Sequence, residues 1–311
     1  MTIAADTITF NIPGAGLHTI ALASPLPTIN QPVTIDGQTQ PGASANTNGP
    51  FQGLNSVLLI EINGANGGNI GLNVTASGTT IRGLIVNRFG ESDIQLSGNN
   101  QTVEGNWLGT SADGTATFAS AARDYWGVTI SGGSNDVIGG TTPAARNLIN
   151  ARLRGIEIGD SANTGHRVSG NLMGTNAAGT ASISRTSGSV GVSLRVVTNA
   201  VIGGLTPAER NVISGFDYGI VIGETSDLGG STATANSVQG NAIGTDVSGS
   251  RVIVHMQYGI VTYSIQNTVG GTAAGAGNVV AGCLFGISMQ VGNGTIVQGN
   301  FIGTDPTGTI D

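Results

Sequence analysis

The sequence contains no lysine and a single cysteine, and only 9% of its 311 residues are charged. A typical globular domain has roughly 25% charged residues, so neutral polar residues must cover most of this surface. The net charge is -7 and all basic residues are arginines, which argues against the basic face of a nucleic-acid-binding protein. The lone Cys283 excludes an internal disulfide framework.

Long apolar runs are missing too. None approaches the roughly 20 residues of a membrane-spanning helix, so we expect no membrane insertion. Met1 to Phe10 lacks a basic stretch followed by an apolar one, and we expect no signal peptide within this chain. The 52 glycines would suit a disordered chain, but valine, isoleucine and leucine recur in short strand-like runs that disordered segments lack.

Three landmarks recur in a fixed order along the chain. A valine after a polar pair comes first, then an asparagine followed by two apolar residues, then a tetrad of glycine, an apolar residue, a variable residue and another apolar residue. The valines are Val103, Val137, Val168, Val201, Val238, Val269 and Val297. The asparagines are Asn106, Asn147, Asn171, Asn211, Asn241, Asn278 and Asn300, and the tetrads begin at Gly127, Gly155, Gly191, Gly219, Gly259 and Gly286.

These landmarks predict an all-β solenoid. Apolar residues with a period of two indicate a strand that has one face in a core. Strands that return in one direction without helices between them must stack in parallel. The sequence therefore predicts a parallel β-helix with three strands per turn, and the handedness of parallel crossovers favours a right-handed coil.

The intervals between landmarks alternate between successive turns. Loops of the form G-T-x-x-x-G, such as 244–249, follow the asparagine on one turn, and loops such as 203–211 precede it on the next. The sequence repeat is thus a pair of turns. We expect one domain over residues 1–311, in which 1–56 form a cap of first strands with a long loop and 57–311 form regular turns.

The asparagines have a structural explanation. Asparagine tolerates left-handed backbone angles at bends, and its amide can bond neighbouring backbone groups. In a stack with about 4.8 Å between strands, each amide can also satisfy buried polar groups of the adjacent turn. We interpret the seven asparagines as a structural ladder and not as catalytic residues.

The motif G-N-x-I-G-T-D-x-x-G-T at 299–309, and I-G-G-x-T-P-A-x-R-N-V-I-S-G at 202–215, resemble the repeats of large bacterial secreted or cell-surface right-handed parallel β-helix proteins. The opening segments 6–14 and 32–42 resemble the N-terminal part of the same family. The resemblance covers essentially the whole chain. It implies an extracellular or cell-surface scaffold, and it implies little about chemistry.

Enzymatic chemistry has weak support in the sequence. The motifs of β-helix hydrolases, which need two carboxyl groups close together, are missing, and the absence of lysine removes one common lyase base. The G-T-D loops suggest calcium, but Asp246 and Asp305 are replaced by Ser111 and Asn176 on equivalent turns. These loops also lie about 10 Å apart, too far to share an ion. We therefore expect no metal and no cofactor, with Ca²⁺ as the weak exception.

One corner of the coil is unusual, because arginines and aromatic residues gather just before the tetrads. Guanidinium groups bind carboxylates or sulfates, so this corner could bind an anionic glycan. The alternative is that the aromatics form a stacked core column of Trp126, Val190, Tyr218, Tyr258 and Phe285. The proposed ligand-binding residues are Arg123, Asp124, Tyr125, Arg185, Arg195 and Tyr258.

The sequence thus favours a non-catalytic extracellular scaffold with a structural, adhesive or glycan-binding role, whose partner is a polysaccharide or cell-surface glycan. The runner-up is a lyase or glycosidase that acts on an acidic polysaccharide, with catalytic candidates Arg152, Arg154, Glu157 and His255. The last turn, 297–311, has no polar cap, so its strand edges stay available for pairing. We therefore also expect homo-oligomers that form by end-to-end or edge association.

Overall fold

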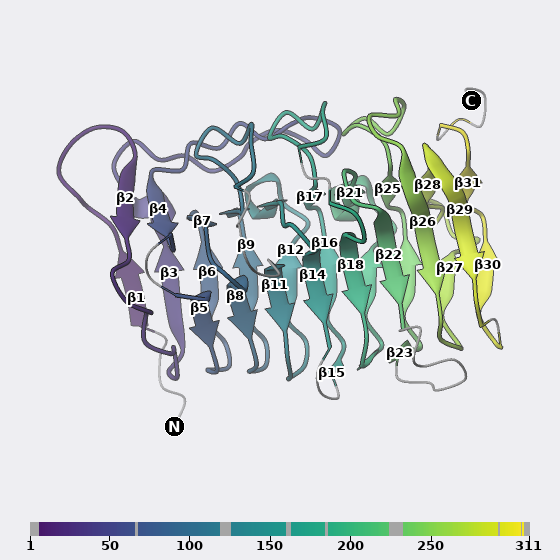
Figure 1. Cartoon of the computed structure of the whole chain (residues 1–311), viewed down its shortest axis with the longest axis horizontal. Coiled ribbons are helices and arrows are strands. Elements are labelled where there is room, and N and C mark those ends of the chain that lie inside the picture. Colours follow the sequence, from purple (N-terminus) through teal and green to yellow (C-terminus); the bar gives the residue numbers. More distant parts are fainter. Residues whose placement is uncertain are drawn as a thin grey trace.

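Figure 1 shows a computed structural model of the chain, in which strands follow one another along a single long axis. The structure describes residues 6–65, 68–118, 126–159, 163–183, 186–223, 233–291, 293–305 and 307. All the pairings between its named strands are parallel, and each turn passes through three sheets, here called A, B and C. The predicted three-stranded, right-handed parallel β-helix is therefore confirmed.

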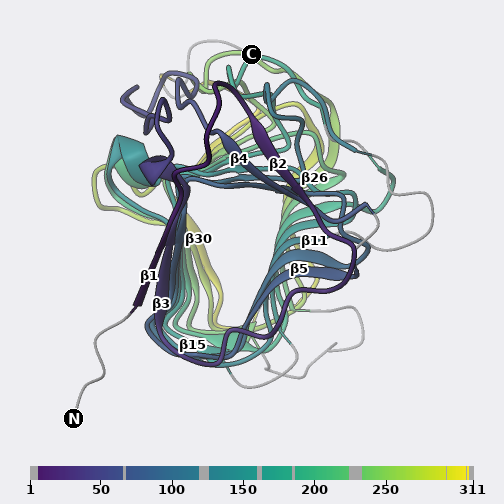
Figure 2. The same ribbon diagram turned by 90° about the vertical axis from the view of Figure 1, so that its left-hand side faces the viewer.

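Sheet A contains the valine strands and forms one wall of the coil (Figure 2). Its central residues, such as Val103, Val168 and Val238, are fully buried. In spatial order its strands are β1 (Asp6–Thr9), β3 (Val33–Asp36), β6 (Thr80–Arg82), β9 (Thr102–Glu104), β12 (Val137–Gly139), β16 (Arg167–Ser169), β20 (Val201–Gly203), β24 (Ser237–Gln239), β27 (Thr268–Gly270) and β30 (Ile296–Gln298).

Sheet B follows the ladder asparagines and forms the second wall. Most of its strands have two residues, and on successive turns a loop leaves the coil before or after them in alternation. They are β2 (His18–Ala21), β4 (Ile60–Asn63), β7 (Ile85–Asn87), β10 (Trp107–Leu108), β13 (Leu148–Ile149), β17 (Leu172–Met173), β21 (Val212–Ile213), β25 (Ala242–Ile243), β28 (Val279–Val280) and β31 (Phe301–Ile302).

Sheet C contains the glycine tetrads and forms the third wall. Where the chain turns back from sheet C toward sheet A, three short strands form a fourth sheet, D. The strands of sheet C are β5 (Ile70–Val74), β8 (Ser92–Leu96), β11 (Trp126–Ile130), β14 (Arg154–Ile158), β18 (Val190–Leu194), β22 (Tyr218–Ile222), β26 (Met256–Thr262) and β29 (Cys283–Met289). Those of sheet D are β15 (Asn163–Thr164), β19 (Val197–Thr198) and β23 (Ala233–Thr234).

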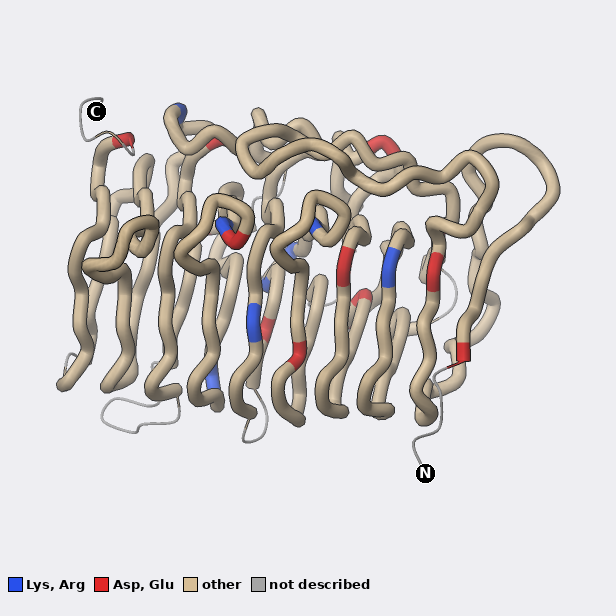
Figure 3. The backbone as a smooth tube through the Cα atoms, turned by 180° about the vertical axis from the view of Figure 1, so that it is seen from behind, with Lys and Arg blue, Asp and Glu red and all other residues tan. Residues whose placement is uncertain are grey.

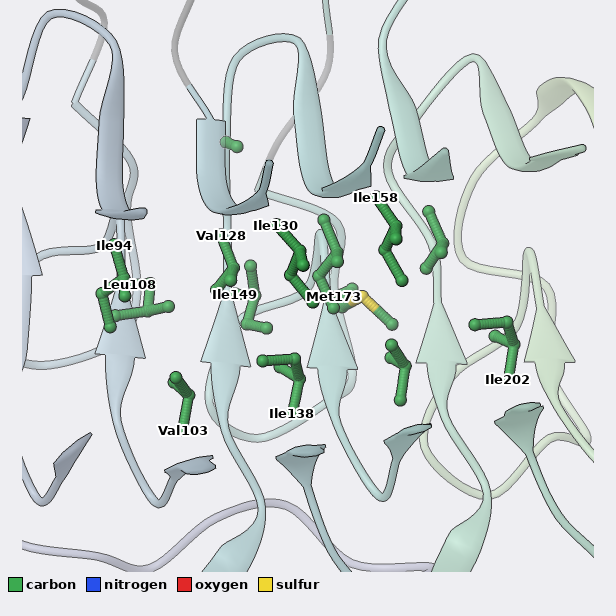
Figure 4. Packing of buried hydrophobic residues seen from close by; sticks show 14 of the residues in the cluster. Ile94, Val103, Leu108, Val128, Ile130, Ile138, Ile149, Ile158, Met173 and Ile202 are labelled. Carbon is green, nitrogen blue, oxygen red and sulfur yellow. The ribbon is translucent and has the colours of Figure 1, made fainter. Parts of the chain in front are cut away.

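The core is the tube that the three walls enclose. Side chains from the walls meet there, for example Ile138 of sheet A, Ile149 of sheet B and Ile130 of sheet C, each with no exposed surface (Figure 4). Full burial of such a side chain stabilises the fold by roughly 1.5–3 kcal/mol. Because every turn contributes the same inward positions, the core is continuous from one end of the coil to the other.

The insertions alternate between two corners, as the intervals in the sequence predicted. On one set of turns a short 3-10 helix lies between sheets A and B, as in η2 (Pro143–Ala145) and η3 (Pro207–Glu209). On the intervening turns a hairpin-like loop lies between sheets B and C. Each of these loops is closed by an antiparallel bridge, which joins Thr110 to Thr117, Thr175 to Ser182 and Thr245 to Val252.

The ladder asparagines are bonded to each other across the A–B corner. The side-chain amide of Asn147 donates to Oδ1 of Asn171 at 2.9 Å, and that of Asn211 donates to Oδ1 of Asn241 at 2.9 Å. The same amides donate to sheet A carbonyls, such as Asn211 to Val168 at 2.8 Å. Six of the seven are fully buried, and the exception is Asn300 on the last turn. The ladder thus satisfies polar groups that the interior would otherwise leave unpaired.

A second polar stack, which the sequence did not reveal, lies at the corner before sheet A. Its members differ in residue type from one turn to the next, so the stack produces no recognisable repeat in the sequence. The backbone N–H of Gln101 donates to Asp136 Oδ1, that of Asp136 to His166 Nδ1, and that of Asn236 to Asn267 Oδ1. Asp136, His166 and Asn267 are all buried, so the stack pairs backbone groups that lie inside the coil.

A strap, residues 40–59, leaves the second turn after η1 (Gly37–Thr39) and runs along the outside of the coil (Figure 1). The backbone N–H of Leu54 donates to the Ala177 carbonyl at 2.7 Å, several turns away. Arg146 is 4% exposed, and its Nη1 donates to the carbonyls of Gly49 and Gln52 at 2.8 and 2.9 Å. The strap therefore ties distant turns together and covers apolar residues on the outer face of sheet B.

Candidate functional site

The outer face of sheet C holds most of the predicted site residues that the structure describes. In β11, Val128 and Ile130 point into the core. Ser92 is the partner of Trp126 on the neighbouring strand, and its hydroxyl is bonded to the Thr129 hydroxyl at 2.8 Å. The Ser92 and Thr129 side chains therefore lie on the same face of the sheet, opposite to Val128 and Ile130. The residue before each tetrad glycine and the third residue of the tetrad therefore share the outer face. They form two columns along the coil, which we call the first and second columns.

Glycine is required at the start of each tetrad because the backbone there lies against sheet B. A Cβ at Gly127 would come within 2.6 Å of the Ile149 side chain, and one at Gly191 within 2.4 Å of Ile213. Such distances are impossible for real side chains. The glycine also falls outside the strand register, and this irregularity turns the preceding side chain outward.

The first column is partly aromatic. Tyr258 stacks on Tyr218, with ring centroids 5.0 Å apart, and on Phe285, at 4.8 Å. The column is not in the core: Tyr218 and Tyr258 are half-buried and Phe285 is 47% exposed. The sequence-based alternative of a stacked column inside the core is therefore wrong about where the column lies. The side chains do stack, but they lie on the outer face, because the tetrad glycine turns them away from the core. Arg154 also stands in this column, between Trp126 and Val190.

Glu157 of the second column is the centre of a charged triad. Its side chain is only 2% exposed, yet it lies on the outer face, because two arginines cover it. Arg195 Nη1 donates to Glu157 Oε1 at 3.0 Å. Arg154 Nε lies 2.6 Å from Oε2, as a close charge contact whose N–H is not aligned as a hydrogen bond. Two cations around one carboxylate leave the triad with a net positive charge.

A groove of about 310 Å³ opens beside the triad. It exists because small side chains, Val190 in the first column and Ser193 in the second, stand between larger ones. The backbone of Gly223 also lines the groove and lies next to Arg195, since its N–H is bonded to the Leu194 carbonyl on the neighbouring strand. The groove is lined by Arg154, Val190, Ser193, Tyr218, Val221, Gly223 and Tyr263.

The tyrosines of the groove are held in their neutral form. Burial raises the pKa of Tyr218, and the neighbouring Tyr263, Tyr258 and Asp217 raise it further. Burial and Tyr258 likewise raise the pKa of Tyr263. Both hydroxyls therefore remain available as hydrogen-bond donors across the physiological pH range.

Several predicted residues do not join this site. His255 is exposed just before β26, three strands from the β14 residue Glu157, or about 14 Å at the spacing of a sheet. Arg152 is exposed and is not among the residues that line the groove. Of the four catalytic candidates, only Arg154 and Glu157 are in contact. Arg123, Asp124, Tyr125 and Arg185 lie outside the described residues.

Sequence reasoning missed Tyr263 and Ser193. Tyr263 directly follows a tetrad, at the position occupied by Ser131, Gly159 and Gly223 on other turns, and this exchange of a small residue for an aromatic one was the available signal. Charged residues are sparse along the coil (Figure 3). Among the described residues, no three His, Cys, Asp or Glu side chains lie together as metal ligands would.

The aspartates of the G-T-D loops bond within their own turns. Asp246 Oδ1 accepts from the backbone N–H of Gly249 at 3.1 Å, and Asp305 Oδ1 accepts from that of Thr307 at 3.0 Å. Asn176 fulfils the same role toward Thr180. These contacts account for a polar residue at this position on each turn.

No protein-family model matches the sequence, and no curated protein matches it. Among solved structures, the Dettilon tailspike protein is similar at a TM-score of 0.37 and 13% sequence identity. The match covers 88% of this chain and 61% of the tailspike chain, so the chain spans less than two thirds of its length. No helix among the described residues is long and apolar enough to cross a membrane. The β-helix assignment rests on the strand pairing described above.

Proposed function

We propose that this protein is an extracellular β-helical scaffold that binds a glycan in the groove on sheet C. The observation that supports this most is the position of the Tyr218 ring, which lines the groove. One face is stacked on Tyr258, and the opposite face is turned toward the smaller Val190 in the same column. Ligand sites combine such apolar or aromatic surfaces with a few polar groups that fix orientation.

The dimensions of the groove agree with a sugar ring. Tyr218 and Arg154 stand two strands apart, about 10 Å, with only Val190 between them. A ring placed midway would lie about 5 Å from each, close to the 5.0 Å that separates the ring centroids of the stacked Tyr218 and Tyr258. The groove volume of about 310 Å³ is at the lower end of the roughly 300–1,000 Å³ of small-ligand sites, as expected for one or two sugar units of a longer chain.

Catalysis on an acidic polysaccharide is the weaker alternative. Glycosidases need two carboxyl groups across the bond that is cleaved, and both oxygens of Glu157 are in contact with arginines. The Glu157 side chain is also only 2% exposed, so it is covered from a substrate in the groove. His255, the other candidate for proton transfer, is three strands away.

Glycan binding is tested with a glycan array, followed by titration calorimetry on the strongest ligand. Tyr218→Ala and Tyr263→Ala should each weaken binding by roughly tenfold or more, since each removes contact area and a hydrogen-bond donor. The matched control is Tyr258→Phe, which keeps the aromatic stack and should retain affinity. An array on which no glycan binds, or binding that survives both alanine variants, would reject the proposal. Turnover of any polysaccharide on that array would favour the enzyme instead.

We also propose that the coil associates end to end. Apolar side chains at both ends are uncovered, such as Ile20 on β2, which is 37% exposed, and Ile302 on β31, which is 51% exposed. Their equivalents in the middle of sheet B, Ile213 and Ile243, have no exposed surface. Edge strands with free backbone groups are templates for pairing with another chain.

A further inference from the structure

We infer that the groove selects sugars that bear an anionic group, a carboxylate or a sulfate, and that Arg154 is the residue that binds the anion. This inference rests on the proposed glycan binding and specifies its ligand class. It is drawn from the charged triad of Arg154, Glu157 and Arg195, whose arrangement places an excess of positive charge at one end of the groove.

Glu157 explains how the positive charge is held in place. The carboxylate is 2% exposed, and an unpaired charge at such a position would be very costly. It contacts one guanidinium on each side, and so it restrains both. A restrained guanidinium loses less freedom when it binds a ligand, and its planar array of donors matches carboxylate and sulfate oxygens.

Arg154 has donor capacity left for a ligand. Its contact with Glu157 uses the Nε side of the guanidinium, and its side chain is 30% exposed and lines the groove. Two neutral tyrosine hydroxyls, those of Tyr218 and Tyr263, line the same groove. Donors therefore predominate over acceptors, and this favours a ligand rich in acceptor oxygens.

Among the described residues, Asp217 is a nearby negative charge that could oppose anion binding. Its Oδ2 accepts a hydrogen bond from the backbone N–H of Gly188 at 2.6 Å. It is not among the residues that line the groove, whereas Arg154 is. The positive end of the groove is therefore the end beside the triad. Asp217 lies toward the other end, where its charge helps to raise the pKa of Tyr218.

The test compares three probes on the intact chain by calorimetry: oligogalacturonate for carboxylate, a carrageenan oligosaccharide for sulfate, and carboxyl-reduced oligogalacturonate as the neutral counterpart. Matched acidic and neutral pairs from the glycan array extend the comparison to other backbones. We expect an acidic member to bind roughly ten- to a hundredfold more tightly than its neutral counterpart. Arg154→Gln should abolish this preference, so that the acidic and the neutral member of a pair bind with equal affinity. Arg154→Lys should restore part of it, and added salt should weaken it.

Arg251→Gln is the matched control, because it removes one positive charge from an exposed loop away from the groove. It should preserve the preference for the acidic probe. Equal affinity of acidic and neutral partners, or a preference that persists in Arg154→Gln, would overturn the inference and leave glycan binding intact. Absence of binding to every glycan would reject the proposed function itself. If Arg154→Gln fails to fold, the double variant Arg154→Gln/Glu157→Gln, which leaves no buried carboxylate unpaired, is used with the same readouts.

Discussion

The side chain of Arg195 occupies the space that a side chain at position 159 would need. A Cβ built on Gly159 would lie 3.0 Å from Cβ of Arg195 and 3.2 Å from its Cδ. Gly159 stands one strand before Arg195, and its lack of a side chain lets the arginine reach back to Glu157 at 3.0 Å. The charged triad therefore depends on a glycine that contributes no side chain to it.

Gly159→Val should displace Arg195 and leave Glu157 with a single cationic partner. We expect a loss of about 1–3 kcal/mol in the free energy of unfolding, since a buried charge loses a hydrogen bond. Urea denaturation measures the loss. In a Glu157→Gln background the same substitution should cost clearly less, because no buried charge remains. An equal cost in both backgrounds would show that the effect is steric crowding alone.

Asn211→Ala should destabilise the coil more than Asn300→Ala. Asn211 is fully buried and bonds to Asn241 Oδ1, to the Val168 carbonyl and to the backbone N–H of Asn171. Its loss leaves two buried acceptors and one buried backbone donor without this partner, at a cost of about 2–4 kcal/mol. Asn300 is half-buried on the last turn, where water can replace its amide. Equal losses for the two variants would contradict a role for the ladder in satisfying buried groups.

Arg146→Met should release the strap. Burial lowers the pKa of Arg146 to about 10, so the guanidinium is still charged at neutral pH and needs the carbonyls of Gly49 and Gln52. Methionine fills the volume and donates no hydrogen bonds. We expect protease cleavage between residues 47 and 55 to accelerate while the circular dichroism of the coil is retained. Arg251→Met, on an exposed loop, should leave the cleavage rate unchanged.

Cys283 should react slowly with thiol reagents until the chain unfolds. Burial raises the pKa of its thiol to about 12, and the thiolate is the reactive form. At pH 8 the folded chain then holds roughly a thousandfold less thiolate than an ordinary cysteine. Because the unfolded thiol loses its proton first, near 9, this group should lower the stability as pH rises from 9 toward 12. Similar labelling rates for folded and unfolded chains would contradict this.

Association at the ends can be tested by mixing two blocked variants. Ile20→Lys places a charge at one end and Ile302→Lys at the other, both at exposed positions. If the ends pair head to tail, each variant alone should remain monomeric, and an equal mixture should form dimers, seen by sedimentation velocity. Dimers of Ile20→Lys alone would indicate contact between identical ends. A wild-type chain that is monomeric at high concentration would rule out association.

Much of the fold could be predicted because its causes are local and repeated. The tetrad pattern of Val128 and Ile130 recurs on each turn. The asparagines that pair the buried polar groups at the corner between sheets A and B recur in the same way. The second polar stack was missed because its members, such as Asp136 and His166, share a position and not a residue type. The strap was recognised as a loop, but its path depends on a guanidinium, that of Arg146, about a hundred residues further along the chain.

The sequence by itself determined the coil, its three strands per turn and the alternation of its loops, because strand periodicity and hydrogen-bond demand act between neighbours in a repeat. Only the tertiary structure decided where a ligand could bind. The groove depends on Arg154, Val190, Tyr218 and Tyr263, which lie on four different turns. These residues come together only because the turns of the coil stack on one another. The side chains of Arg154, Val190 and Tyr218 point outward because of the tetrad glycine that follows each of them, whose backbone packs against sheet B.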